Sequence, residues 1–572
     1  MQIFCDAIIL WFITNVVVAQ SAWRSQNGLA INSKRSYGSM KSGRVQSGSS
    51  YRYNRPRLEY ANNPGLIIQI AQSMMNEMGK TLSQVITHKV RHMHLPEKHK
   101  NIGRISMTFT NLHVTEITPP KIEIHPSPRT PYQITASMQV EQLTIYGEVI
   151  SSMRLLDDRV FYVTLDDVAI NVYVKLTKLP SGQMHAEISG CNFYLGDVSV
   201  QTKHSNKHRF SYSRIAERKL RTELENGMCE KIIQKGGKAM NAFLGKYPTK
   251  VHVSEFLPRR HRSKSGVKNR ASDSVHKSTN SLAIFGRNTN TLRNVVIDTS
   301  LLSDPKVVNA GMLQFDVRGN AIWMGRNPAP FYPPPIRPIS RPSNDSMLVI
   351  YISESVPNAL LHHLHKHGIL KLRIDKNSKM ELSSLLKNDC QGWFCLNSFL
   401  PQFHTMYPSK LPVIYLTTRS APVVHIDPRM VTVEIDARIS LNAEDEDRSN
   451  NVTAEVLTLD IKAFASVVPY IQGNRLKAKV LSATMKTTTQ RDMLKVDPNK
   501  VEVLVDILRK SFEDSVQNIG KSGIELPRSS IFAIRSGRAY LLDKAIEFDF
   551  VLTFNEKVLL EKLNGLFGGL MS

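Results

Sequence analysis

The stretch Asn63–Val90, NPGLIIQIAQSMMNEMGKTLSQVITHKV, decides the fold because it carries the longest helical pattern in the chain. Asn63 is placed to cap a helix N-terminus, and Pro64 occupies a first-turn position where its missing N–H costs nothing. We expect a single helix of about 28 residues, roughly 40 Å long. Its apolar residues recur at helical spacing and form one wide face: Ile67, Ile70, Ala71, Met74, Met78, Leu82, Val85 and Ile86.

The methionines of this stretch have two interpretations. Met74, Met75 and Met78 have adaptable side chains that suit an irregular or changeable partner surface. An ordinary core helix shows the same spacing of apolar residues. The rest of the chain favours the first interpretation.

The residues after this helix change to a period of two, which is typical of half-buried strands. Residues 105–204 predict a meander of long antiparallel strands with a turn at Leu179–Gly182, and residues 211–246 predict a second long helix. The alternating strand residues include Val168, Ile170, Val172, Val174, Leu176, Met184, Ala186 and Ile188, and the inward helix residues are Leu220, Leu224, Met228, Ile232 and Phe243.

The second half of the chain repeats this order after a proline-rich joint. The joint ends in NPAPFYPPPIRPISRP at residues 327–342, whose prolines enforce extended backbone. PPKIEIHP at 119–126 and APVVHIDP at 421–428 place prolines at the same spacing around an alternating apolar core. We therefore expect two copies of one unit, a sheet with long helices. In the second copy the expected elements are a strand at 348–352, a helix at 356–367, strands at 411–480, a helix at 499–519 and final strands.

The N-terminus predicts export from the cell. An apolar run, AIILWFITNVVVA, ends at Ala19 and precedes small residues, which fits a signal peptide cleaved after Ala19 or Ala22. A retained N-terminal anchor is the alternative. No other segment approaches the length of a membrane span, so the expected mature protein is secreted and extracellular.

Secretion gives the cysteines a structural meaning. Cys191, Cys229, Cys390 and Cys395 remain after cleavage and allow three pairings; pairing within each half, Cys191 with Cys229 and Cys390 with Cys395, is the economical choice. Metal binding is the weaker explanation, because neither couple has zinc-ligand spacing with a partner pair. Two triplets, at Asn344 and Asn451, are candidate glycosylation sites.

The formal net charge of +25 is concentrated in a few segments. Residues 20–62 and 259–270 have the composition of solvated tails or linkers, and an anionic partner suits both, although the dibasic Arg259-Arg260 is equally a protease site. Export and the lack of an aromatic-studded basic motif argue against nucleic acid. A basic segment after the first helix is expected at a tip of the molecule, where it would bind an anionic surface through Lys89, Arg91, Lys98, Lys100 and Arg104.

Catalytic motifs give no support for an enzyme. The sequence has no G-x-S-x-G elbow, no H-E-x-x-H and no glycine-rich phosphate loop, so we expect no catalytic residues and no cofactor. His363 and His367 lie one helical turn apart and could share a metal, but no cysteine or carboxylate stands beside them. We expect a solvated helix face there and no metal site.

The chain resembles a family of secreted proteins that includes bactericidal/permeability-increasing protein, lipopolysaccharide-binding protein and the phospholipid and cholesteryl ester transfer proteins. The resemblance rests on NPGLIIQIAQ at Asn63, Cys191 with MCEKI at Met228, NPAPFYPPP at Asn327 and GNRLKAK at Gly473. It implies an α+β fold: a boomerang of two barrels of antiparallel strands joined by a central sheet, each barrel holding a lipid beside its long helices. It also implies a disulfide between Cys191 and Cys229.

This resemblance and the sequence patterns together predict six segments. They are a signal peptide (1–19), a basic disordered tail (20–62), an N-terminal lipid-binding barrel (63–250), a linker with central strands and the proline-rich bridge (251–345), a C-terminal lipid-binding barrel (346–555) and an amphipathic C-terminal segment (556–572).

An acyl chain gains roughly 0.8 kcal/mol for each methylene that leaves water, so a dry groove between helix and sheet suffices to hold a phospholipid-like amphiphile. For the first pocket we expect Ile67, Ile70, Met74, Met78, Leu82, Leu224, Met228 and Ile232, and for the second Leu360, Leu364, Leu504, Leu508, Phe512 and Val516.

Two functions fit these expectations: carriage or transfer of lipid, and recognition of bacterial lipopolysaccharide. A structural or anionic-surface-binding extracellular protein without lipid carriage is the alternative. The C-terminus adds a final strand, with Phe548, Phe550, Leu552 and Phe554 alternating, and then an amphipathic segment that could cover a pocket mouth.

Overall fold

The structure is a computed structural model. It describes residues 62–91, 94–95, 97–102, 105–127, 130, 133–151, 160–202, 210–245, 248–253, 291–308, 311–338, 345–377, 386, 396, 400–408, 410–445, 454–526 and 531–558. Several expectations lie outside these residues: the signal peptide, nearly all of the basic tail, the segment 259–270, Arg104, Cys390, Cys395, Asn344, Asn451 and the amphipathic segment from residue 559.

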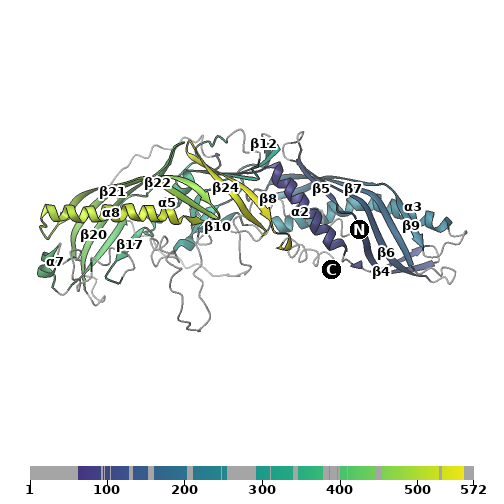
Figure 1. The fold of residues 1–572 in the computed structure, drawn as a ribbon, viewed down its shortest axis with the longest axis horizontal. Coiled ribbons are helices and arrows are strands. Elements are labelled where there is room, and N and C mark those ends of the chain that lie inside the picture. Colours follow the sequence, from purple (N-terminus) through teal and green to yellow (C-terminus); the bar gives the residue numbers. More distant parts are fainter. Residues whose placement is uncertain are drawn as a thin grey trace.

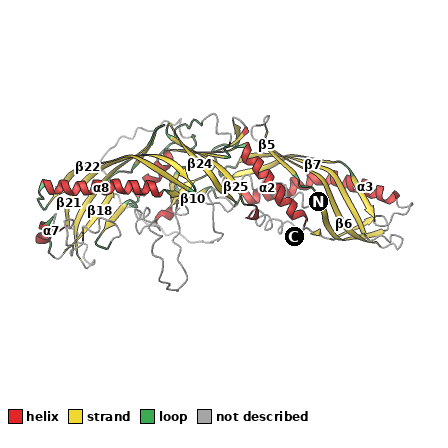
Figure 2. Cartoon of the chain, in the orientation of Figure 1, coloured by secondary structure: helices red, strands yellow, loops and turns green. Residues whose placement is uncertain are grey.

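The described chain is an elongated molecule built mostly of strands, with a few long helices (Figures 1 and 2). One sheet and its helices occupy each end, and a further sheet lies between them. None of the described helices is both long and apolar enough to cross a membrane.

The opening stretch is a strand followed by a helix, so the prediction of one continuous helix is wrong. Strand β1 (Leu66–Ile70) precedes helix α2 (Gln72–Arg91). All five β1 residues are buried, because β1 pairs antiparallel with β13 (Met312–Val317) on one side and β16 (Leu348–Ser353) on the other. The sequence of a strand that is buried on both faces is a continuous apolar run. It lacks the alternation of apolar and polar residues by which a strand is distinguished from a helix.

Asn63 does not cap a helix either. Its side-chain Nδ2 donates to the backbone oxygen of Pro333, 3.0 Å away. The residue thus ties the start of the chain to the proline-rich bridge.

The central sheet joins the two ends of the molecule. Its order is β12 (Lys306–Val308), β13, β1, β16, β25 (Ala545–Phe554) and β24 (Phe532–Leu542). One face is apolar and continues into the core of the N-terminal half through Ile68, Phe315 and Phe548. Phe550 and Leu552 join this core as predicted, and Phe554 packs beside it.

The N-terminal half contains the predicted meander. Its eight strands are β2 (His94–Leu95), β3 (Lys98–Ile102), β4 (Ile105–Ile117), β5 (Lys121–Pro126), β6 (Gln133–Ser151), β7 (Val160–Lys178), β8 (Met184–Leu195) and β9 (Val198–Thr202). Alternate residues of β7 from Val168 to Leu176 are buried, as the period of two predicts. The second predicted helix is continuous but changes form: α3 (Phe210–Lys231) passes through a π-helical turn (Ile232–Gly236) into α4 (Gly237–Leu244).

The C-terminal half has the same order of elements. Its sheet contains β17 (Lys371–Ile374), β18 (Lys410–Thr418), β19 (Val423–Ile426), β20 (Val431–Asp445), β21 (Ala454–Gln472), β22 (Arg475–Asp492) and β23 (Ile524–Glu525), accompanied by α7 (Pro401–Met406) and the long helix α8 (Pro498–Ser522). The two proline-flanked repeats form β5 and β19, and each pairs antiparallel with the long strand that follows it. The predicted internal repeat is therefore confirmed at these two strands.

A fourth sheet, β10 (Lys250–His252), β11 (Val295–Asp298), β14 (Ala321–Trp323) and β15 (Asn327–Pro328), packs beneath α5 (Ser355–Lys366). This contact determines the environment of His363 and His367.

Candidate functional site

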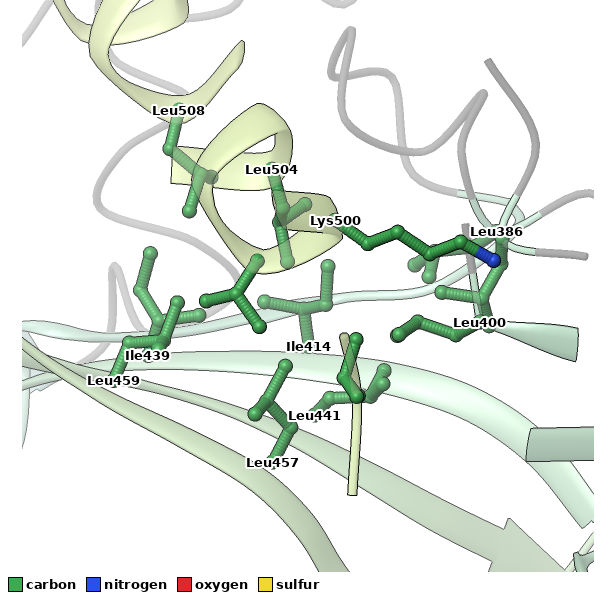
Figure 3. Close-up of a pocket in the computed structure, with 13 residues that line it drawn as sticks. Leu386, Leu400, Ile414, Ile439, Leu441, Leu457, Leu459, Lys500, Leu504 and Leu508 are labelled. Atoms are coloured by element: carbon green, nitrogen blue, oxygen red, sulfur yellow. The ribbon is translucent and has the colours of Figure 1, made fainter. Parts of the chain in front are cut away.

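An apolar pocket lies in the C-terminal half, between the first turns of α8 and the sheet (Figure 3). The space between its walls is about 680 Å³, part of it open to solvent. Twelve of the thirteen lining residues are leucine, isoleucine or valine: Leu386, Leu396, Leu400, Ile414, Ile439, Leu441, Leu457, Leu459, Val496, Val501, Leu504 and Leu508. The thirteenth is Lys500.

The periods of helix and strand explain how these residues meet. On α8, Lys500, Leu504 and Leu508 are four residues apart and share one helix face. On β20 and β21, the lining residues are two apart in each strand and point to the same side of the sheet. Apolar walls of this kind make no hydrogen-bonding demand, so the pocket can accept a hydrocarbon chain.

The start of α8 is fixed by its own capping. The Asp497 carboxylate accepts a hydrogen bond from the Asn499 N–H (3.0 Å), and Pro498 occupies the first helical turn. Just before the helix, the Asp492 carboxylate accepts from the N–H groups of Leu494 (3.0 Å) and Val496 (2.7 Å). These bonds hold the segment that forms one wall of the pocket.

Only some of the residues that we expected in this pocket line it. Leu504 and Leu508 line it, and Phe512 packs against the same apolar cluster one turn further along α8. Val516 is half-buried outside that cluster. Leu360 and Leu364 are elsewhere, because α5 covers the fourth sheet and directs them into its core.

The strand residues Ile439, Leu441, Leu457 and Leu459 were missed. Their alternation is visible in the sequence, but which face of a strand meets which helix depends on long-range pairing.

In the N-terminal half, seven of the eight expected residues belong to one buried cluster in the core. Met74, Met78, Leu82, Leu224, Met228 and Ile232 are each at most 3% exposed, and Ile70 joins them. Ile67 does not, because neighbouring strand residues point to opposite faces. It packs instead with Val349 and Tyr351 on the other face of the central sheet.

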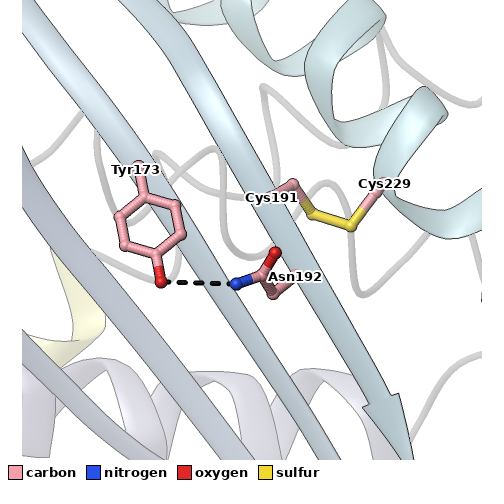
Figure 4. The surroundings of a disulfide bond; sticks show 4 residues. All are labelled: Tyr173, Cys191, Asn192 and Cys229. Atoms are coloured by element: carbon pink, nitrogen blue, oxygen red, sulfur yellow. Dashed lines mark hydrogen bonds between the residues drawn. A yellow bond between two sulfur atoms is a disulfide. The ribbon is translucent and has the colours of Figure 1, made fainter.

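The predicted disulfide between Cys191 and Cys229 is confirmed (Figure 4). It joins β8 to α3 with a Cα–Cα distance of 5.5 Å. Beside it, the Asn192 side chain donates to the Tyr173 hydroxyl on the neighbouring strand β7 (3.4 Å). The bridge therefore attaches the second long helix to the first sheet.

The basic segment begins at the end of α2. Lys89 is half-buried and Arg91 is exposed in the last turn of that helix. Lys98 and Lys100 lie on β3, which pairs with the first residues of β4.

The expectation of a solvated histidine face on α5 is wrong. His363 is 2% exposed, and its Nε2 lies 3.2 Å from the backbone oxygen of Ala321. The His367 ring stacks on Trp323 with a centroid distance of 3.4 Å. Burial lowers the pKa of both imidazoles, which favours neutral rings in a packed core. Within the described ranges, no three His, Cys, Asp or Glu side chains are grouped to hold a metal.

Comparison with known proteins gives a consistent result over most of the chain. Two family models match: LBP / BPI / CETP family, N-terminal domain, at residues 69–247, and LBP / BPI / CETP family, C-terminal domain, at residues 289–548. A bactericidal permeability-increasing protein of Sebastes schlegelii is 19% identical over 435 residues, 74% of this chain and 81% of that protein. A crystal structure of lipopolysaccharide binding protein is similar with a TM-score of 0.47 and 16% identity, over 86% of this chain and 99% of that one.

Proposed function

The chain belongs to the LBP / BPI / CETP family, whose members bind or transfer lipids and are not enzymes, and from this premise we propose that it is a secreted carrier of phospholipid-like amphiphiles. Each half would hold one amphiphile, either for transfer between membranes or particles or for recognition of bacterial lipopolysaccharide. The proposal includes the finer architecture, a boomerang of two barrels with the segment limits given above, and glycosylation at Asn344 and Asn451.

The observation that carries this proposal is the apolar pocket beneath α8. Its twelve aliphatic side chains surround a space that is partly open to solvent, and the only polar group among the lining residues is that of Lys500. Each methylene buried there would gain roughly 0.8 kcal/mol without any hydrogen bond to the chain. Leu504 and Leu508 are the proposed contacts on the helix, with Phe512 and Val516 further along it.

In the N-terminal half the proposed site lies between the sheet and the helices α2 and α3. Its walls would be Ile70, Met74, Met78, Leu82, Leu224, Met228 and Ile232, which now pack against one another. The flexible methionine side chains can repack around a guest chain at small cost.

Recognition of lipopolysaccharide is the second function that an observation favours. Arg91 is exposed in the last turn of α2, and Lys98 and Lys100 follow it in the sequence on strand β3. Lys89, Arg91, Lys98, Lys100 and Arg104 are the proposed contacts with an anionic surface. Binding to anionic vesicles that weakens as salt is raised, and that is lost when Arg91, Lys98 and Lys100 are neutralised together, would support this role.

The carrier function is tested by extracting the purified secreted protein and identifying its lipids by mass spectrometry. We expect bound amphiphile in the wild type and less of it in Leu457→Trp, because the indole fills the C-terminal pocket. Leu481→Trp is the matched control, since Leu481 is 49% exposed on β22 and does not line the pocket. A wild-type protein that carries no lipid and takes none up from vesicles would contradict the proposal.

A further inference from the structure

Lys500 is the one charged residue among those that line the apolar pocket. In Figure 3 its side chain extends from the first turn of α8 over the pocket toward Leu386 and Leu400. The residue is neither buried nor fully exposed. An ammonium group beside twelve aliphatic side chains is costly unless it reaches water or meets an anion.

The described protein supplies no anion to Lys500. Val496, Val503 and Leu504 occupy three of the four positions that lie three or four residues from Lys500, and the fourth is Asp497. The Asp497 carboxylate instead caps α8 by accepting from the Asn499 N–H, and Glu502, two positions after Lys500, does not face it on the helix. Two other cations on α8 have partners, since Arg509 pairs with Asp506 and Lys510 with Asp514.

The pocket thus combines an apolar surface with a positive charge. The walls accept a hydrocarbon chain, and an unpaired cation stands at their edge. An anionic head group would form charge-assisted hydrogen bonds with the ammonium while its chain lies among the leucines. A neutral head group would leave the ammonium without a partner.

We propose that the C-terminal pocket selects amphiphiles with an anionic head group, a carboxylate or a phosphate, which the Lys500 ammonium binds. This inference rests on the proposed function, because it names the class of amphiphile that the same pocket takes.

The test compares two probes that differ only in head-group charge: a fluorescent C18 fatty acid and its methyl ester. Binding to the full-length protein is measured below the probes' aggregation concentration. Leu457→Trp gives the background from any other site. We expect the wild type to bind the acid more tightly than the ester by about tenfold or more, the range for a hydrogen bond to a charged group.

Three lysine variants locate the effect. Lys500→Met keeps the aliphatic length and removes the charge, so it should lose the preference for the acid and keep its affinity for the ester. Lys500→Arg should retain the preference. Lys510→Met is the matched control on the same helix, because Lys510 lies outside the pocket with a side chain 72% exposed, and it should behave as the wild type.

Two competitors distinguish the source of the anion. Lysophosphatidic acid should displace the fatty acid from the wild type and do so less well from Lys500→Met. Inorganic phosphate has no chain and should displace neither probe. If it competes as well as lysophosphatidic acid, the site takes a free anion and the proposal is overturned.

The remaining outcomes separate this inference from the proposed function. If acid and ester bind the wild type equally, or if Lys500→Met binds the acid as the wild type does, Lys500 only covers the pocket with its methylenes and the selection is wrong, while lipid carriage stands. If neither probe binds the wild type above the Leu457→Trp background, both proposals fail for this pocket.

Discussion

Cys229 shows at the scale of a single residue how the second long helix is held. Its bridge to Cys191 closes a loop with a sequence separation of 38, which constrains the unfolded chain by about 4 kcal/mol on the chain-entropy estimate. We expect Cys229→Ser to lose a few kcal/mol of unfolding free energy and to lower the secreted yield, as measured by thermal denaturation and by the amount of protein in the medium.

The double variant provides the control for this prediction. Cys191→Ser should cost as much as Cys229→Ser, and the two together should cost no more than either alone, because both remove the same bond. Additive losses would show that the cysteines act separately.

Replacing Gly79 by alanine is expected to destabilise the protein, whereas the same change at an ordinary helix glycine stabilises it. A Cβ atom at this position would lie 2.5 Å from the backbone oxygen of Ile122 on β5. We therefore expect Gly79→Ala in α2 to lower the melting temperature, although alanine favours a helix interior by about 1 kcal/mol. Gly227→Ala in α3 is the control, since no atom apart from its chain neighbours and the backbone of its own helix lies within 4 Å of its Cβ position, and it should raise the melting temperature slightly. An equal rise in the melting temperature of both variants would show that α2 can move away from β5.

At the scale of elements, the C-terminal segment carries a prediction that lies outside the described residues. Leu559, Leu563, Phe567 and Leu570 recur at helical spacing after β25, and such an apolar stripe in contact with water needs a surface to cover. We expect deletion of residues 563–572 to leave secretion and the melting temperature nearly unchanged and to alter lipid transfer between vesicles. A truncated protein that transfers lipid at the full-length rate would exclude a lid, and one that does not fold would make the segment part of the core.

The sequence predicted most elements, and the exceptions have physical reasons. Long strands and amphipathic helices such as β7 and α8 were identified because each has one buried face and therefore a clear period. β1 was read as helix because both of its faces are buried. Eleven of the thirteen lining residues of the pocket were missed for a different reason: strand residues such as Leu441 and Leu457 have the right alternation, but only the folded sheet places them under Leu504.

The histidines of α5 show the same limit. Their spacing suggested a solvated face, whereas the fourth sheet covers His363 and Trp323 stacks on His367. Each strand of that sheet contains only two to four residues, which is too few to show a period of two. No local sequence pattern predicts such a contact.

At the scale of the whole molecule, the second face of the central sheet contains buried polar groups. Gln69 donates to Gln314 (2.8 Å), and Ser346 donates to Asp549 (2.7 Å). Glu547 is only 2% exposed on the same strand as Asp549. Burial raises the pKa of both carboxyls above the ordinary value.

This burial predicts a pH dependence with a definite sign. Between the ordinary carboxyl pKa of about 4 and the raised value, the folded protein keeps the Glu547 proton that the unfolded chain has lost, so Glu547 makes the protein less stable as pH rises through that window. We expect Glu547→Gln to stabilise the protein at neutral pH, by about 1.4 kcal/mol for each unit of the pKa shift that is removed, and to give no gain near pH 4. Unfolding free energies measured across this range check the prediction.

Glu556→Gln is the control, because Glu556 is exposed just after β25. A stabilisation of the same size in both variants, or one that persists at pH 4, would contradict the role of burial.

The strand order of the central sheet has a consequence for the relation between the two halves. β1 and β16 pair antiparallel about the Ile68 and Ile350 positions, and each is flanked by a hairpin, β12 with β13 on one side and β24 with β25 on the other. A two-fold axis through the central pair would exchange the halves, which is the symmetry of an isologous homodimer. The two halves are joined here as subunits would be across such an axis, by backbone hydrogen bonds that do not depend on side-chain identity. The side chains of each half can therefore change, with methionines in the core of one and leucines and a lysine around the pocket of the other, while the pairing between the central strands is retained.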